Sequence, residues 1–299
     1  MTDAIANLDA WRASGATFAH GDHRLFFQQG GSGAPLLLIH GFPTASWDWA
    51  RIWPALSRRF RLIAMDMLGF GFSSKPKDHV YTIFEQADLQ EALLAQLGVA
   101  RVHLLAHDYG DTVAQELLAR HEERRARGDR SLTLESICFL NGGLFPESHH
   151  PRPVQVALAG PQGAAISQLL DEAAFTRGFG EVFGPGTQPN RAELADFWRL
   201  VAHDDGHRIW HLLIRYLEER RDNRERWVGA LLGTATPLRL VDGPEDPVSG
   251  AHLAARYREL VPNADVVLLP GIGHYPQTED PAGVVAALLA FHDSRVPSR

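Results

Sequence analysis

The chain has 299 residues, of which 45% are hydrophobic and 22% charged, and its formal net charge is −7. This length suits one large α/β domain with an inserted lid, or two smaller domains. The net negative charge argues against nucleic-acid binding, which usually requires a basic surface. No run of about 20 apolar residues is available to cross a membrane, and a single cysteine, Cys138, excludes an internal disulfide. Residues 1–10 lack the pattern of a signal peptide, so a soluble cytoplasmic protein is expected.

Short apolar runs alternate with helical patterns along most of the chain. Strands are expected at residues 25–27, 35–39, 61–67, 102–106, 135–140, 237–241 and 265–269. Helices are expected at residues 46–58, 83–97, 112–125, 251–260 and 282–291. This alternation predicts an α/β fold with a mostly parallel sheet and helices on both of its faces.

The alternation stops after the strand at 135–140. The following segment has helical patterns, many aromatic residues and several prolines and glycines, but no convincing strand. We therefore predict three ranges: a first part of the core at 1–142, a helical cap at 143–230, and a second part of the core at 231–299. Two runs of mixed charge, 121–125 and 218–226, are typical of solvent-exposed helix surface.

The segment 104–111 reads Leu-Leu-Ala-His-Asp-Tyr-Gly-Asp and lies between an expected strand and an expected helix. This is the context of a nucleophile elbow, a tight turn that needs small residues two positions before and after the nucleophile. Ala106 and Gly110 meet that need around Asp108. A carboxylate is already ionised at neutral pH, so Asp108 could attack an electrophilic carbon and form an ester. The alternative is that Asp108 merely caps the helix, a position that aspartate favours.

An acid and a histidine follow the elbow in the order that hydrolases with a nucleophile elbow use. Asp246 follows the expected strand 237–241, and His274 follows the strand 265–269, so both lie where open α/β sheets carry their sites. Asp246 would orient His274, which would activate a water to cleave the ester. Glu245 and Asp242 compete with Asp246 for the acid role. The alternative acid position after strand 135–140 holds Asn141, which cannot form an ion pair.

Residues 40–43 read His-Gly-Phe-Pro and follow the strand 35–39. In a hydrolase of this type the loop supplies one backbone N–H of the oxyanion hole, here that of Phe42, and the residue after the nucleophile, Tyr109, supplies the other. Residues 66–71, Asp-Met-Leu-Gly-Phe-Gly, are a further marker of the fold whose role is structural.

Together, His-Gly-Phe-Pro, the aspartate elbow, Asp246 and His274 resemble the epoxide hydrolase and haloalkane dehalogenase branch of the α/β-hydrolase superfamily. Four stretches, 107–117, 141–147, 226–231 and 274–277, are similar to the mesoderm-specific transcript protein family. The resemblance covers nearly the whole chain. It implies an α/β-hydrolase fold with an eight-stranded, mostly parallel sheet flanked by helices and an inserted helical cap. It also implies a small apolar organic substrate, water as the second reactant, and no cofactor.

The two branches differ in what holds the leaving group. Epoxide hydrolases use two cap tyrosines, whereas haloalkane dehalogenases use N–H donors, among them a tryptophan after the nucleophile or in the cap. The candidates in the expected cap are Tyr216, His149, His150, Trp198 and Trp210. His-Gly-Phe-Pro favours an epoxide hydrolase; the alternatives are a haloalkane dehalogenase and, in another class, a non-catalytic ligand-binding protein.

A row of histidines in the expected cap recurs every four residues, at His203, His207 and His211. On an unbroken helix they would share one face and could ligate a metal. The intervening Asp-Asp-Gly at 204–206 predicts a break in the helix, so no metal site is expected there.

Overall fold

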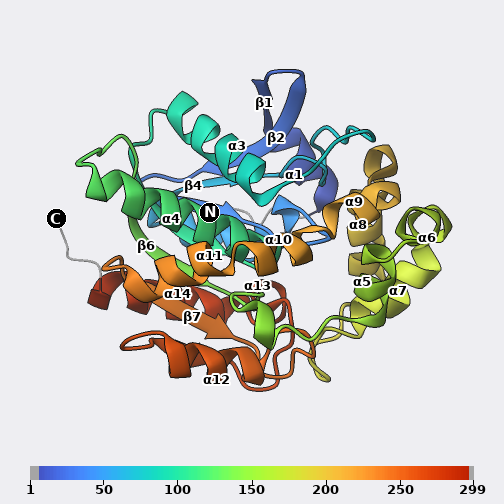
Figure 1. Ribbon diagram of the computed structural model, residues 1–299. Coiled ribbons are helices and arrows are strands. Elements are labelled where there is room, and N and C mark those ends of the chain that lie inside the picture. Colours follow the sequence, from blue (N-terminus) through green and yellow to red (C-terminus); the bar gives the residue numbers. More distant parts are fainter. Residues whose placement is uncertain (1–6, 296–299) are drawn as a thin grey trace.

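A computed structural model describes residues 7–295 and contains one sheet of eight strands (Figure 1). The strands are β1 Ala16–His20, β2 His23–Gly30, β3 Ala34–Ile39, β4 Phe60–Met65, β5 Arg101–Ala106, β6 Thr133–Phe139, β7 Leu238–Asp242 and β8 Val266–Leu268. Their order across the sheet is β1-β2-β4-β3-β5-β6-β7-β8. The pairs that β2 makes with β1 and β4 are antiparallel, and every pair from β4 to β8 is parallel. The predicted α/β fold class is confirmed.

The helices outside the expected cap are α1 Leu8–Ser14, η1 Ser46–Trp49, α2 Trp53–Leu56, α3 Ile83–Gln96, α4 Tyr109–Ala126, α12 Ala251–Leu260, α13 Pro276–Glu279 and α14 Pro281–Arg295. The single helix expected at 46–58 is wrong, because two short helices occupy this stretch. Pro54 lies in the first turn of α2. A proline has no backbone N–H to donate to the preceding turn, so it starts a helix better than it continues one.

Two apolar layers cover the sheet, and alternate residues of a strand face each of them. In β3, Leu37 and Ile39 belong to the core cluster that includes side chains of α3, α4, α11 and α12. Leu36 and Leu38 face the other cluster, which includes side chains of α1, α2 and α14. The central strands are therefore buried on both faces, which explains why they appear in the sequence as continuous apolar runs.

Only helices lie between β6 and β7 in the described chain. They are η2 Pro146–Ser148, α5 Pro153–Ala159, α6 Gly163–Leu169, α7 Glu172–Gly180, α8 Arg191–Ala202, η3 His203–Ile209, α9 Trp210–Leu213, α10 Tyr216–Asp222 and α11 Arg224–Gly233. Helices α5 to α9 gather at one end of the sheet, on the right in Figure 1. None of the helices within residues 7–295 is long and apolar enough to cross a membrane.

The position of α11 bears on the extent of the cap. This helix packs along α4, in the layer that covers the sheet, and it spans residue 230. The domain boundaries after residues 142 and 230 therefore remain a prediction, and we propose that α5 to α9 form the cap proper. The outermost residues of the predicted core ranges, 1–6 and 296–299, lie outside the described chain.

The first helix gives a test of the packing. Trp11 of α1 is fully buried, meets Trp53 edge-on at 5.0 Å between ring centroids, and donates from Nε1 to Ser46 Oγ at 3.2 Å. We predict that Trp11→Ala lowers the free energy of unfolding by about 3–5 kcal/mol through the cavity it leaves. Urea unfolding followed by circular dichroism measures this loss. Val80→Ala, at a side chain that is 78% exposed, is the control, and equal midpoints for the two variants would contradict the packing described.

Candidate active site

Asp108 occupies a strained turn between β5 and α4. Its backbone has φ 50° and ψ −108°, a left-handed conformation that aspartate rarely adopts. The turn fits because two glycines close to it have no side chain: a Cβ on Gly110 would lie 2.2 Å from the Ile39 carbonyl oxygen, and one on Gly41 would lie 2.8 Å from the Asp108 Cβ. The Asp108 side chain makes no capping hydrogen bond with α4, which argues against the helix-cap alternative.

One donor of the expected oxyanion hole contacts the Asp108 carboxylate directly. The Phe42 backbone N–H donates to Asp108 Oδ2 at 3.0 Å. Phe42 follows β3, the neighbour of β5 in the sheet, so the sheet itself brings the loop and the elbow together. The Tyr109 side chain is buried against Phe70 and Tyr216. The backbone N–H of Tyr109 remains the predicted second donor.

The structure brings His274 and Asp246 into contact at the ends of β8 and β7. His274 Nδ1 lies 2.7 Å from Asp246 Oδ2. The same carboxylate accepts from the backbone N–H of Val248 at 2.7 Å and from the Ser249 hydroxyl at 2.9 Å. Five further hydrogen bonds hold the Asp246 loop. Asn141 Nδ2 donates to Asp246, Gly243 and Ser249, Asn141 Oδ1 accepts from the Gly243 backbone N–H, and the Ser249 backbone N–H donates to Asp246. Asn141 therefore supports the acid, a role that sequence reasoning missed.

The two other acids considered for this role are close in sequence: Asp242 ends β7, and Glu245 directly precedes Asp246. Glu245 is exposed. Asp242 is fully buried, and neither of its carboxyl oxygens has a hydrogen-bond partner among the described residues. Burial, followed by the charge of Asp246, raises the pKa of Asp242 to about 8. A carboxyl that is mostly protonated at neutral pH cannot supply the counter-charge that a histidinium needs.

Burial and ion pairing shift the pKa values of Asp246 and His274 in opposite directions. Burial alone would raise the pKa of Asp246, but the charge and hydrogen bond of His274 and the donors of its own loop lower it to about 2. Burial alone would lower the pKa of His274, but Asp246 and then Asp108 raise it to about 9. The resting site therefore holds His274 as an imidazolium at neutral pH, between two carboxylates.

A second histidine fixes the backbone of the first. His107 Nε2 donates to the His274 carbonyl oxygen at 2.7 Å, and the two rings lie 4.9 Å apart. Burial, followed by the charge of His274, lowers the pKa of His107 to about 3, so this ring is neutral. Its position directly before Asp108 in the sequence was the only available signal for this contact.

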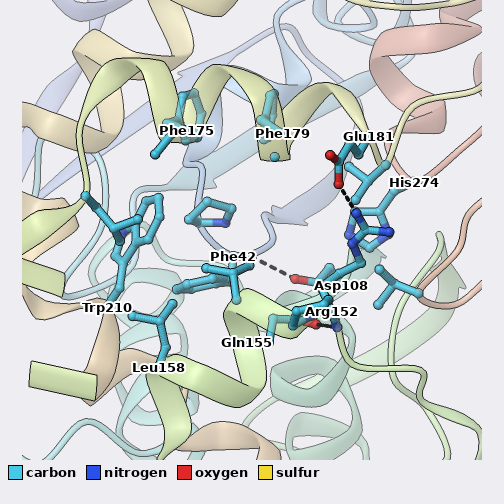
Figure 2. A pocket seen from close by; sticks show the side chains of 18 of the residues that line it. Phe42, Asp108, Arg152, Gln155, Leu158, Phe175, Phe179, Glu181, Trp210 and His274 are labelled. Atoms are coloured by element: carbon cyan, nitrogen blue, oxygen red, sulfur yellow. Dashed lines mark hydrogen bonds and ion pairs between the residues drawn. The ribbon is translucent and has the colours of Figure 1, made fainter. Parts of the chain in front are cut away.

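Asp108 and His274 both line a cavity of about 340 Å³ beneath the cap. Figure 2 shows Phe175 and Phe179 along one wall and Trp210 and Leu158 at the end away from the carboxylate. Besides Asp108 and His274, the lining residues with polar side-chain atoms are Arg152, Gln155, Glu181, Trp210 and Tyr275, and Arg152 forms an ion pair with Glu181. A pocket with this lining suits a small apolar molecule.

Of the five expected leaving-group residues, Trp210 alone lines this cavity. Tyr216 is buried between the rings of Phe42 and Tyr109. Trp198 packs on Phe175 and His207. His150 is exposed and stacks on His252 at 3.9 Å, and His149 precedes it in the loop after η2. None of these four lines the cavity, although His149 and Tyr216 lie close enough to Asp108 for its charge to act on their pKa values. Gln155, which the sequence did not single out, does line it.

The expectation that residues 218–226 form solvated surface is wrong for its central arginine. Arg220, in α10, is 2% exposed. Its Nη2 donates to the Asp108 carbonyl oxygen at 3.0 Å, and its Nε donates to Thr112 Oγ1 at 2.6 Å. The run looks like surface because Arg221 and Asp222 beside it are exposed. Only the tertiary fold reveals which of its charges points inward.

Metal ligation at His203, His207 and His211 would need one continuous helical face. Asp204 and Asp205 adopt φ values of 49° and 59°, so the helix breaks where the sequence predicted. Within the described residues, one group does place ligand atoms within 4.8 Å of one another: His23, His79 and Glu85. His79 and Glu85 are already hydrogen bonded at 2.7 Å, and none of the three lines the cavity.

Comparison with known proteins places the chain in a family. A family model described as "alpha/beta hydrolase fold" matches residues 34–165. The mesoderm-specific transcript protein of Mus musculus is 43% identical over 298 residues, which cover 96% of this chain and 88% of the relative. The chain belongs to the mesoderm-specific transcript protein family.

Two solved structures share the fold. Haloalkane dehalogenase DatA from Agrobacterium tumefaciens C58 aligns with a TM-score of 0.77 at 24% identity, covering 95% of this chain and 97% of that one. Epoxide hydrolase CorEH aligns with a TM-score of 0.73 at 22% identity, covering 93% and 98%. At these identities the likeness establishes the α/β-hydrolase fold, and the choice of substrate depends on the site itself.

The charge state of His274 can be tested by titration. We predict that the imidazole titrates near pH 9 in the wild type and at lower pH in Asp246→Asn, because burial then outweighs the remaining attraction. A folded pKa above the ordinary 6.5 means that His274 stabilises the fold fully below pH 6.5, and that this contribution is lost as the pH rises through about 9. Histidine-selective NMR measures both titrations. Equal pKa values in the two proteins would contradict the pairing.

Proposed function

We propose that the protein is a hydrolase whose Asp108 attacks carbon and forms an alkyl-enzyme ester, which a water activated by His274 then hydrolyses. One observation carries this proposal: Asp108 and His274 face the same apolar cavity, with Asp246 fixed behind the histidine. A carboxylate in the nucleophile position favours attack on an electrophilic carbon, because attack on an ester carbonyl would give an unstable anhydride. The paired acid and histidine argue against a purely ligand-binding role, which needs no activated water.

The second step uses groups already in place. The ester carbonyl oxygen would keep the Phe42 N–H donor that Asp108 Oδ2 has in the resting site. His274 Nδ1 is held by Asp246, which leaves Nε2 to accept a proton from water. The water oxygen bonds to the Asp108 Cγ, the bond from Cγ to the alkyl oxygen breaks, and the alcohol leaves with a proton while the carboxylate is regenerated.

Epoxides are the substrate class that the charge state of the site favours most. Opening an epoxide breaks a carbon–oxygen bond and leaves an alkoxide, which needs a proton. No tyrosine of the cap lines the cavity to supply it, but His274 does line it and carries a proton at neutral pH. Giving that proton to the alkoxide leaves His274 neutral, the form that then activates water. The net reaction is addition of one water to the epoxide to give a diol.

Haloalkanes are the second candidate, supported by the position of Trp210 on the cavity wall. An indole N–H is a donor that can hold a departing halide. Here the carbon–halogen bond breaks as Asp108 bonds to carbon, and no proton is needed at that step. His274 would lose its proton afterwards, because esterification removes the Asp108 charge that helps to raise its pKa.

The covalent step can be tested by trapping. We predict that His274→Gln mixed with styrene oxide or 1-bromohexane accumulates an adduct on the Asp108 peptide, because attack proceeds while water activation is lost. Peptide mass spectrometry identifies the modified residue. His292→Gln, a histidine that packs on Phe60 away from the cavity, is the control and should accumulate none. Full activity in Asp108→Ala would rule out the mechanism.

The two substrate classes predict different pH profiles for the first step. With styrene oxide, the rate of ester formation should fall as the pH rises through about 9, since the proton on His274 is lost there. With 1-bromohexane it should not fall, because halide leaves without a proton. Rapid-quench mass spectrometry of the wild-type enzyme measures the rate of ester formation with each substrate. A flat profile with styrene oxide would show that another group protonates the alkoxide.

A further inference from the structure

A buried arginine lies directly behind the nucleophile and is not used in the chemistry above. Arg220 Nη2 lies 4.0 Å from Asp108 Oδ1, in addition to its hydrogen bonds to the Asp108 carbonyl oxygen and to Thr112. Its guanidinium also lies over the Tyr216 ring, 4.5 Å from the centroid. The chain makes room for it: a Cβ on Gly143 would lie 2.0 Å from Arg220 Nη1.

A guanidinium that is removed from water needs an opposite charge nearby, because an isolated buried ion is costly. Two carboxyl groups of α4 and its elbow are available, Asp108 and Asp111. Both oxygens of Asp111 are buried without a hydrogen-bond partner among the described residues. Burial, followed by the charge of Asp108, raises the pKa of Asp111 well above its ordinary range. Arg220 makes no hydrogen bond with Asp111 but lies 4.0 Å from the Asp108 carboxyl group, so Asp108 is the counter-charge that the geometry gives to Arg220.

We propose that Arg220 is a positioning residue whose positive charge, fixed beside Asp108, speeds hydrolysis of the alkyl-enzyme ester. The inference rests on the proposed function, since it concerns the second step of that reaction. The resting carboxylate balances the guanidinium. Forming the ester removes the negative charge and leaves the guanidinium buried without its partner, which raises the free energy of the intermediate.

Hydrolysis reverses this imbalance. The water oxygen adds to Cγ, and negative charge develops on Oδ2 and then on Oδ1 as the bond from Oδ1 to Cγ breaks. Oδ1 leaves with the alkyl group as the alcohol, and the new carboxylate, made of Oδ2 and the water oxygen, returns beside Arg220. A cation fixed 4.0 Å from the Oδ1 position stabilises the charge on that leaving oxygen without reorganising. In the first step the same cation stabilises the fully charged carboxylate of the ground state. It stabilises the transition state less, because the negative charge is then moving to the leaving group. Arg220 therefore favours the second step over the first.

A structural role alone would act differently. If the guanidinium only held the elbow through its hydrogen bonds, removing it would misplace Asp108 and slow both steps together. Separate measurement of ester formation and ester hydrolysis distinguishes the two roles. Arg239 supplies a matched control, because it is also buried, bonds to Asp265 and the Ala287 carbonyl oxygen, and lies at the start of β7 rather than at the site.

The experiment mixes wild type, Arg220→Gln, Arg220→Lys and Arg239→Gln with styrene oxide in a rapid-quench instrument and follows the ester by intact mass. We expect Arg220→Gln to form the ester within about threefold of the wild-type rate and to hydrolyse it at least about tenfold more slowly, so that ester accumulates. Arg220→Lys keeps the charge and should hydrolyse the ester faster than Arg220→Gln. Arg239→Gln should match wild type in both steps.

Arg220→Gln can overturn the inference in two ways. Equal slowing of both steps in Arg220→Gln means that the role is structural, and an unchanged rate of hydrolysis means that the charge has no effect. If Arg220→Gln does not fold, as judged by circular dichroism, the result for Arg220→Lys decides. Ester hydrolysis within about tenfold of the wild-type rate supports a role for the positive charge, and equal slowing of both steps contradicts that role. The absence of an Asp108 adduct in every protein, with both styrene oxide and 1-bromohexane, instead refutes the proposed function and the inference with it.

Discussion

The turn at Asp108 is the constraint on which the rest of the site depends. A left-handed aspartate lies between β5 and α4, and the backbone can make that turn only where the residues packed most closely against it have no side chain. Gly41 and Gly110 supply the space. The Phe42 N–H and the Arg220 guanidinium then meet the turn from different elements. These contacts stabilise the strained backbone of Asp108, as is common for strained residues in active sites.

Charge balance links the parts of the site. In the resting state two buried carboxylates, Asp108 and Asp246, are matched by two cations, Arg220 and protonated His274. Esterification neutralises Asp108 and leaves an excess positive charge, which is relieved if His274 gives up its proton in the same step. Epoxide opening consumes that proton, so the cluster stays neutral throughout the cycle. Halide departure would leave the excess in place until His274 deprotonates, and this difference is the reason why we propose an epoxide before a haloalkane.

Much of the fold and the core of the site could be predicted from the sequence, because both depend on local patterns. Continuous apolar runs identify strands buried on both faces, and the elbow at Asp108 has a fixed spacing of small residues. Strand β1 was missed because only Phe18 within it is buried, so it has no apolar run. Asp246 was predicted to be the acid from its place after the strand at 237–241, and the structure places its carboxylate 2.7 Å from His274 Nδ1.

The remainder depends on contacts between distant segments. Arg220 lies 112 residues after Asp108, and nothing in its mixed-charge neighbourhood distinguishes it from the exposed Arg221. The cap candidates were chosen by residue type, but burial of Tyr216 beneath Phe42 and the placement of Gln155 and Trp210 on the cavity wall follow from how the cap helices pack. Side-chain direction in such short, irregular helices has no reliable periodic signal.

The central claim is that Asp108 forms a covalent bond to carbon and gives up one of its own oxygens. Turnover of styrene oxide in water enriched with oxygen-18, followed by mass spectrometry of the Asp108 peptide, tests it most directly. The account predicts that the peptide gains heavy oxygen over many turnovers, and that the product of a single turnover carries an ordinary oxygen from the enzyme. A peptide that stays unlabelled, with heavy oxygen entering the product in the first turnover, would show that water attacks the substrate directly and would contradict the account.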